Sequence, residues 1–501
     1  MKVNTVKNSP LSFFTVFAFA AATTCAFASA DDHTQTMDPR ATPVPHDAKT
    51  YHFSPDPVFS EPYNFQRQLD IYGAKHLNPT ARPLLELGRE MYGPGELSAG
   101  KNLFGEKNLA HLQLLLYGDV RFVVAQNKVG SATRDIAAAK LNLDLDLKLT
   151  STERIHYFFT PLDKDGVTTS TQFGPKRFRG KDQSFFDMKP DALFFEGDLG
   201  RIAAGFSGQD TKSDIPFAVG LIPLLFQNGV WAQDAIIGGA ITIPARNSPA
   251  LQISNMDVTF FAGLQNVTTA AISNDHQASV FGFNTFIEAN KGYWEFGYGY
   301  VDGRGPSSDL SYHNLSAAFT RRYFDFLSNS VRVIWNFGQH PGAGRARTAD
   351  GVLVLLENSF ATEKPLTLVP YLNLFAGFKK PQSLFRAAGA GGVLLNTGIN
   401  FETDGITGFP KLEDSAHDTY GGAFGVEYLF DLSQQVVFEV ASLDTMGNDP
   451  LRPAKGSQTA LGFRFQKKLN YAWIFRADAM VAHRQGLDNL SGFRVELRRK
   501  F

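Results

Sequence analysis

Charged side chains alternate with apolar ones in several stretches of this sequence. In the clearest stretch, Leu141–Thr150, leucines occupy every second position, and Asp144, Asp146 and Lys148 fall between them. Successive side chains of a β-strand point to opposite faces, so the leucines would share one face and the charges the other. Carboxylates and amines aligned along one wet face can set an electric field for ions and solutes that pass over it. The spacing therefore predicts strands that present charge along one face.

The same alternation places sixteen charged side chains on the polar faces of expected strands, and these are the candidate lumen-lining residues. They are Asp119, Arg121, Asp144, Asp146, Lys148, Arg154, Glu295, Arg332, Glu427, Glu439, Arg464, Arg476, Asp478, Arg494, Glu496 and Arg498. Acidic and basic members are balanced in number. The count favours no sign of ion, and uncharged solutes such as sugars stay among the candidates.

Catalytic chemistry has weaker support. The sequence contains no G-x-S-x-G elbow, no H-E-x-x-H pair and no phosphate-binding P-loop. His156 and His483 fall in expected strands and could supply a base to a serine, and Asp144 with Asp146 could hold a cation. A strand histidine more often lines a polar face than catalyses, so we expect no enzymatic activity, no metal site and no cofactor.

The composition excludes several other classes of protein. The 501 residues carry 48 Lys and Arg against 49 Asp and Glu, a net charge of −1, and lack the basic excess typical of nucleic-acid-binding proteins. A single cysteine excludes a disulfide scaffold, an iron–sulfur cluster and an all-cysteine zinc site. With 43 % hydrophobic and 13 % aromatic residues, the chain can bury enough surface to fold.

Residues 1–30 have the pattern of a cleaved signal peptide. Lys2 and Lys7 precede the apolar stretch Leu11–Ala22, which is shorter than the about 20 residues that a bilayer span needs. Ala28–Ala30 forms an A-x-A cleavage site, and a membrane anchor is the less favoured alternative. We therefore expect this segment to be removed on export, which leaves a mature chain without cysteine.

About eighteen alternating stretches follow residue 114, each compatible with a membrane-crossing strand of roughly 9–11 residues. Alternation alone also fits a soluble sandwich or propeller. Charges within the strands, aromatic residues such as Tyr293 and Trp335 toward strand ends, and a terminal Phe501 favour the membrane alternative. The expected fold is all-β: a transmembrane antiparallel β-barrel of 16–18 strands over residues 111–501, preceded by a short helical or extended segment.

The end of the chain resembles the assembly signal of bacterial outer-membrane barrels. Phe493, Val495, Leu497 and Phe501 stand at alternate positions of the last expected strand, and the terminal phenylalanine closes it. Arg499 departs from the pattern. The resemblance implies recognition by the barrel-assembly machinery.

A second, shorter stretch is similar to a hairpin of the general porins. Over residues 194–205 a strand would end at Gly-Asp, turn, and return as a second strand over 200–207. Leu199 stands where general porins have an aromatic residue. The size and strand number look like those of the alginate-export and substrate-selective porins, without a motif that assigns the chain to either.

Three other segments could shape a pore. Residues 31–110 are expected to be periplasmic or inserted into the lumen, and the spacing within 82–92 predicts a short helix that packs on the barrel or docks a partner. Residues 208–235 contain the apolar stretch 215–226, which could fold into the lumen or pack on other loops. Residues 379–418 are expected either to constrict the lumen or to form a disordered surface loop.

The resemblance to porins implies an exported protein of the Gram-negative outer membrane through which small hydrophilic solutes diffuse, passively or selectively. Its expected partners are outer-membrane lipid, the barrel-assembly machinery and the solutes, without nucleic acid and with a homo-oligomer left open. Two alternatives stand beside this interpretation. One is a barrel hydrolase of the phospholipase or deacylase kind, and the other is a plugged barrel that serves as an adhesin or anchor.

Overall fold

The computed structural model of the chain describes residues 80–88, 100–164, 166–173, 184–272, 274–364, 367–387, 390–431 and 433–501. All of them belong to one compact unit, Gly73–Phe501, of the two into which the chain divides. The expected signal peptide and most of the expected N-terminal segment lie outside the described residues.

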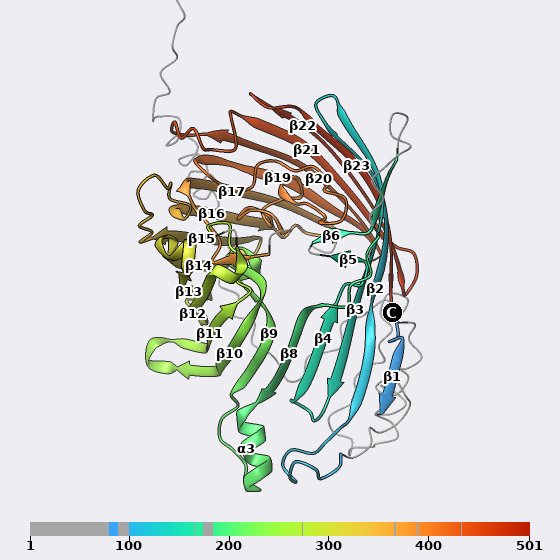
Figure 1. The fold of residues 1–501 in the computed structure, drawn as a ribbon, viewed down its shortest axis with the longest axis vertical. Coiled ribbons are helices and arrows are strands. Elements are labelled where there is room, and N and C mark those ends of the chain that lie inside the picture. The colour runs from blue at the N-terminus through green and yellow to red at the C-terminus, as the bar shows by residue number, and fades with distance from the viewer. Residues whose placement is uncertain are drawn as a thin grey trace, which may run out of the picture. The chain divides into compact units, whose positions relative to one another are not determined.

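Eighteen antiparallel strands form one closed barrel (Figure 1), which confirms the predicted fold class at the upper limit of the predicted strand number. In order around the barrel they are β2 (Gln113–Val129), β3 (Ala132–Lys148), β4 (Arg154–Phe159), β8 (Pro190–Asp198), β9 (Pro216–Phe226), β10 (Ala232–Ser248), β11 (Ile253–Gln265), β12 (Ala278–Ala289), β13 (Gly292–Gly303), β14 (Tyr312–Tyr323), β15 (Leu327–Phe337), β16 (Asp350–Phe360), β17 (Leu368–Lys380), β19 (Thr419–Asp431), β20 (Gln434–Thr445), β21 (Gln458–Lys468), β22 (Trp473–Arg484) and β23 (Leu490–Lys500). The long strand β3 pairs with β4 over one half and with the short β7 (Ser170–Phe173) over the other. Two further short strands, β5 (Asp163–Lys164) and β6 (Val167–Thr168), pair only with each other.

The barrel closes where the first and last long strands meet. β2 pairs with β23 in a continuous register from Asp119 opposite Lys500 to Val129 opposite Leu490. Phe501 then exchanges two backbone hydrogen bonds with Gly118, of 2.9 and 3.0 Å.

The same edge of β2 continues beyond Phe501 and pairs there with a short strand, β1 (Leu85–Gly88). The prediction of a helix over residues 82–92 is therefore wrong for its described part. The spacing of apolar residues is compatible with a helix, but backbone pairing with β2 is a contact distant in sequence that local spacing does not report.

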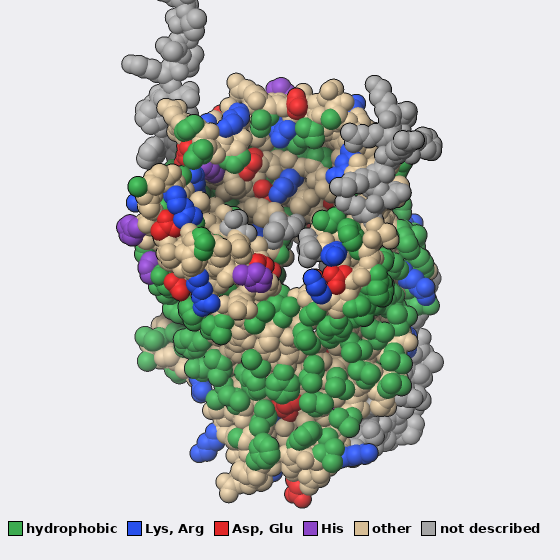
Figure 2. All heavy atoms as spheres, in the orientation of Figure 1, with side chains coloured by type: hydrophobic (Ala, Val, Ile, Leu, Met, Phe, Trp, Pro, Cys, Tyr) green, Lys and Arg blue, Asp and Glu red, His purple; other side chains and the backbone are tan. Residues whose placement is uncertain are grey.

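The two faces of the sheet differ as the alternation predicts. On β2, Phe122 and Val124 are half exposed on one face, whereas Val123 and Ala125 are buried on the other. Figure 2 shows hydrophobic side chains gathered in a belt over the outer wall, with charged side chains beyond its edges. An apolar outer face of this kind suits contact with lipid.

Connections at the two ends of the barrel differ in length. At the end that holds Phe501, β12 and β13 are joined by only two residues, Asn290 and Lys291, whereas residues 381–418 join β17 and β19 at the other end. We name residues 381–418 the lumen loop. It includes the short strand β18 (Phe385–Arg386) and the 3-10 turn η8 (Ile399–Phe401).

One connection at the Phe501 end is a helix, α3 (Leu199–Ser207), between β8 and β9. The prediction of a returning strand over 200–207 is wrong. Asp198 caps the helix through its carboxylate, which accepts from Arg201 N at 2.8 Å, and Gly208 ends it with a left-handed φ of 71°. Among the described residues, no helix is both long and apolar enough to cross a membrane.

The apolar stretch within 208–235 is a strand of the wall, β9, and not a constricting loop. Its outward side chains include Val219 and Leu225, which are more than half exposed. Its inward side chains are apolar as well, because Ile222 is buried and Leu224 packs against the apolar cluster inside the barrel. A strand with two apolar faces lacks the alternation that marks its neighbours.

Part of the chain fills one side of the lumen. Trp231 is buried, donates from Nε1 to Asn314 Oδ1 at 2.9 Å, and accepts from Leu384 N at 2.7 Å. A Cβ atom on Gly297 would lie 2.6 Å from the Trp231 ring, and one on Gly299 would lie 2.5 Å from Leu384. Glycine at these two positions of β13 therefore lets the inserted chain approach the wall closely. The lumen loop lies against the inner wall, as the constriction alternative requires.

Candidate solute path

Strand register places all sixteen candidate residues on the inner face of the barrel. Asp478 stands opposite Arg464 on one side and Arg494 on the other, and Asp146 stands opposite His156. The inner face is identified by the lumen loop, which contacts it on well-separated strands. Gln382 N donates to Asn336 of β15, for example, and an ion pair joins the loop to β23.

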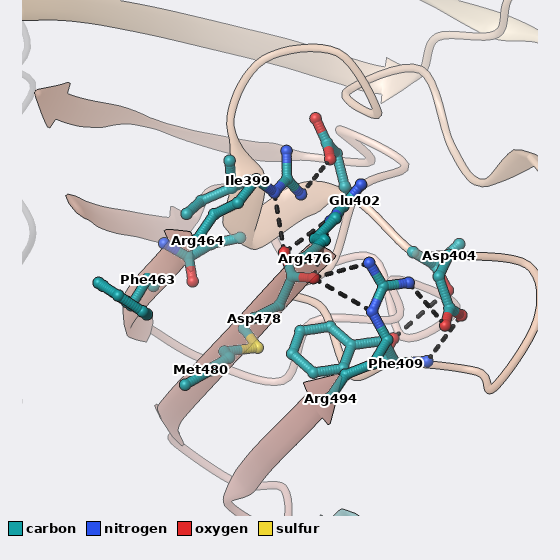
Figure 3. A pocket seen from close by; sticks show the side chains of 14 residues that line it. Ile399, Glu402, Asp404, Phe409, Phe463, Arg464, Arg476, Asp478, Met480 and Arg494 are labelled. Atoms are coloured by element: carbon teal, nitrogen blue, oxygen red, sulfur yellow. Dashed lines mark hydrogen bonds and ion pairs between the residues drawn. The ribbon is translucent and has the colours of Figure 1, made fainter. Parts of the chain in front are cut away.

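Three arginines from neighbouring strands converge on one carboxylate (Figure 3). Asp478 accepts from Arg464 Nε and Arg476 Nε, both at 2.8 Å, and from Arg494 Nη2 at 2.7 Å. Alternate residues of adjacent antiparallel strands share a face, which brings these side chains together. The structure thus assembles four of the predicted residues into one cluster, and Glu496 lies 3.9 Å from Arg494 Nη1.

The lumen loop supplies two further carboxylates to this cluster. Glu402 Oε2 accepts from Arg464 Nη2 at 2.6 Å, and Asp404 Oδ2 lies 2.8 Å from Arg494 Nη1. Burial opposes ionisation of Asp404, but the Arg494 guanidinium and hydrogen bonds from Thr407 outweigh it and hold the pKa of Asp404 below its ordinary value. Ion pairs therefore fasten the loop to β21 and β23.

Glu439 of β20 holds the loop at a second place. Its carboxylate accepts from the backbone N–H groups of Ile399 and Asn400 and from Asn400 Nδ2, each at 2.8 Å, and from the Tyr371 hydroxyl at 2.6 Å. A buried carboxylate with four donors is well compensated, so Glu439 fixes the η8 turn within the lumen.

A smaller group lies at the seam between β2 and β23. Asp119 accepts from Arg121 Nε at 2.8 Å and from Asn142 Nδ2 at 2.9 Å, and Arg498 Nε lies 2.8 Å from it. An ion pair thus joins β2 to β23, and a side-chain hydrogen bond joins β2 to β3, in addition to the backbone bonds.

A more acidic group spans β3, β4 and β8. His156 Nε2 lies 3.1 Å from Glu196 Oε1 and its ring stacks on Phe194. Arg154 Nη1 lies 3.8 Å from Asp146 Oδ2, and Asp144 stands on the same face two residues along β3. His156 thus hydrogen-bonds a carboxylate, and no serine among the described residues is bonded to its ring. His483, the other candidate base, is exposed on the outer face of β22.

Arg332 forms a separate buried group with Glu295 and Glu357, at 3.6 and 3.8 Å. Its Nη1 donates to Gln227 Oε1 at 2.5 Å, and Gln227 lies in the turn that precedes Trp231.

Glu427 and Lys148 lie outside these groups. Glu427 is half-buried opposite Val437 of β20, and Lys148 ends β3 opposite Gln113. The prediction missed Glu357 and Glu196. Both could have been found, because each lies at an inward-facing alternate position of a strand that the sequence does predict. Gln227 and the loop carboxylates have no such signal, because their positions depend on how a connection folds back.

Comparison with solved structures identifies the fold. Pseudomonas aeruginosa OpdK, solved with vanillate, superposes with a TM-score of 0.51 at 10 % identity, over 77 % of this chain and 98 % of that one. Pseudomonas aeruginosa OpdO does so with a TM-score of 0.50 at 10 % identity, over 77 % of this chain and 97 % of its own. This chain has the fold of an outer-membrane β-barrel. Neither a protein-family model nor a curated protein matches its sequence.

Proposed function

We propose that this chain is an outer-membrane channel through which small hydrophilic solutes diffuse. The observation that carries the proposal is the pairing of an apolar outer face with a charged inner face in one closed barrel. The apolar outer face suits contact with lipid, and the charged inner face suits a water-filled lumen. The lumen loop, fastened by Asp404 and Glu402, would set the width of the passage.

The charges along the proposed path are unequal in their access to water. Arg121, Arg498, Arg154 and Arg476 are 26–35 % exposed at the side chain, whereas the aspartates they pair with are at most 8 % exposed. Near Asp119 and Asp478 a passing solute would therefore meet guanidinium groups before these carboxylates, whereas Glu196 beside Arg154 and Glu402 beside Arg464 are themselves 38 % and 33 % exposed. Since guanidinium binds carboxylates with two parallel hydrogen bonds, we propose small carboxylates as the favoured solutes. Vanillate, the ligand in the OpdK structure, belongs to this class.

Uptake by proteoliposomes tests both parts of the proposal. The purified barrel should admit an aromatic carboxylate faster than an uncharged sugar of similar size, and protein-free liposomes should admit neither. Equal entry of the two solutes would overturn the preference for carboxylates and leave the channel intact. No entry of either, from a barrel shown to be folded by its heat-dependent gel migration, would overturn the channel.

The apolar packing inside the barrel favours one second candidate, a plugged barrel that serves as an anchor. Trp231, Leu384 and Phe385 are fully buried against the inner wall and close part of its lumen. The same proteoliposome experiment separates this candidate from a channel.

A further inference from the structure

The helix α3 packs through its smallest residues. Gly200, Ala204 and Gly205 are its buried positions, and a Cβ atom on Gly205 would lie 2.2 Å from the carbonyl oxygen of Phe104. The helix therefore rests closely on the segment before β2 and has no large side chain on its packed side.

Its larger apolar side chains point elsewhere. Leu199, Ile202, Ala203 and Phe206 follow the i, i+3, i+4, i+7 spacing of a single helix face. Leu199 is 41 % exposed and Phe206 is 83 % exposed. A globular helix usually buries this stripe, so the exposed face of α3 needs an apolar environment that the described residues do not supply.

The strands on either side of α3 show where such an environment lies. Phe195 of β8 and Phe217 of β9 pair on the outer face of the wall, with ring centroids 5.7 Å apart, and Val219 is half exposed two residues along β9. The helix starts at Leu199, four residues after Phe195 (Figure 1). In Figure 2 the hydrophobic belt of the wall reaches toward this end of the barrel.

We infer that α3 is an interfacial helix whose Leu199–Phe206 stripe inserts into the membrane leaflet at the end of the barrel that holds Phe501. Short connections mark the periplasmic end of outer-membrane barrels, so the leaflet is the periplasmic, phospholipid one. Exposed Arg201, on the side of α3 away from the stripe, and exposed Lys212, after the helix, supply the charge expected at a headgroup layer.

A lipid surface fits the stripe better than a protein does. Only four side chains form it, whereas each side of a stable protein interface contributes about 20–30 residues. The stripe is also continuous with a wall that itself faces lipid, and insertion needs no matching surface on a partner.

Spin-label accessibility tests the inference, which rests on the proposed function only in placing the wall in a membrane. Without residues 1–30 the chain contains no cysteine, so Phe206→Cys in the mature chain carries one nitroxide. Leu199→Cys repeats the measurement with Phe206 retained. Val219→Cys serves as the lipid-facing reference, and Arg201→Cys serves as the reference on the opposite face of the same helix.

In phospholipid vesicles, labels at 199 and 206 should collide with oxygen severalfold more than with a water-soluble nickel chelate, as at 219. The label at 201 should show the reverse. If the labels at 199 and 206 behave like the one at 201 while 219 remains in lipid, the inference is overturned. Low accessibility to both reagents with dipolar broadening would instead identify a second copy, and also overturns it. If 219 itself meets the chelate, the barrel is not in the membrane, and the proposed function fails with it.

Discussion

Replacement of Arg494 by methionine tests how the lumen loop is held. Arg494 is 1 % exposed and bridges Asp404 of the loop, at 2.8 Å, and Asp478 of the wall, at 2.7 Å. In Arg494→Met, Asp478 keeps Arg464 and Arg476, both at 2.8 Å. The carboxylates that lose a counterion are Asp404, at 2.8 Å, and more weakly Glu496, at 3.9 Å. The substitution therefore weakens mainly the attachment of the lumen loop to the wall.

Removal of one partner from a buried ion pair costs about 3–5 kcal/mol. Asp404 keeps hydrogen bonds from the backbone of Ile406 and Thr407, so we expect the lower end of this range. About 3 kcal/mol corresponds to a roughly hundredfold shift from attached toward detached loop. A detached loop widens the passage and fluctuates, which should raise single-channel conductance and open-channel noise.

Arg476→Met is the matched control, because Arg476 donates to Asp478 of the same strand and forms its ion pair within the wall. Both variants and the wild type would be recorded in planar bilayers after a folding check by gel migration. Conductance and noise should rise in Arg494→Met only. Identical traces for Arg494→Met and the wild type, or the same rise in Arg476→Met, would refute the account of the loop attachment.

Three further predictions follow from the faces, the seam and the loop. Leu145→Arg should lower the outer-membrane yield far more than Asp146→Asn, since a lipid-facing arginine costs up to about 2–4 kcal/mol near the midplane, and equal yields would contradict the assignment of faces. Deletion of Phe501 removes both backbone bonds to Gly118 and the proposed assembly signal, formed with Phe493, Val495 and Leu497, so the yield of heat-modifiable barrel should fall; an unchanged yield would show that the terminal residue is dispensable. The pKa of Asp404 is lowered, so its ion pair is intact above the ordinary value of 3.8 and is lost as pH falls through the lowered pKa. Wild-type conductance should therefore stay constant as pH falls to 3.8 and should rise as pH falls through the lowered pKa of Asp404. A rise between about pH 5 and 8, where histidines titrate, would show that another group holds the loop.

The strands and their faces could be predicted from the sequence because alternation reports the environment of each face directly. Asp144, Asp146 and Lys148 lie inward, as their spacing among leucines requires. The strand β9 was not predicted, because its inward side chains pack against the apolar cluster inside the barrel and do not face water.

Two other elements show what local patterns leave out. The helix α3 carries readable signals, namely the cap at Asp198 and the stripe from Leu199 to Phe206, but a resemblance to a porin hairpin favoured a strand. β1 has helix-like spacing and becomes a strand by pairing with the free edge of β2. The partners of Asp404 and Glu402 could not be predicted, because they depend on the path of the lumen loop.

Single-channel conductance of the purified protein in a planar bilayer tests the central claim most directly. A folded barrel should produce discrete current steps that a small carboxylate blocks in a concentration-dependent way, more strongly than an uncharged sugar of similar size. A folded barrel that inserts and passes no current would contradict the channel and identify the inserted loop as a plug.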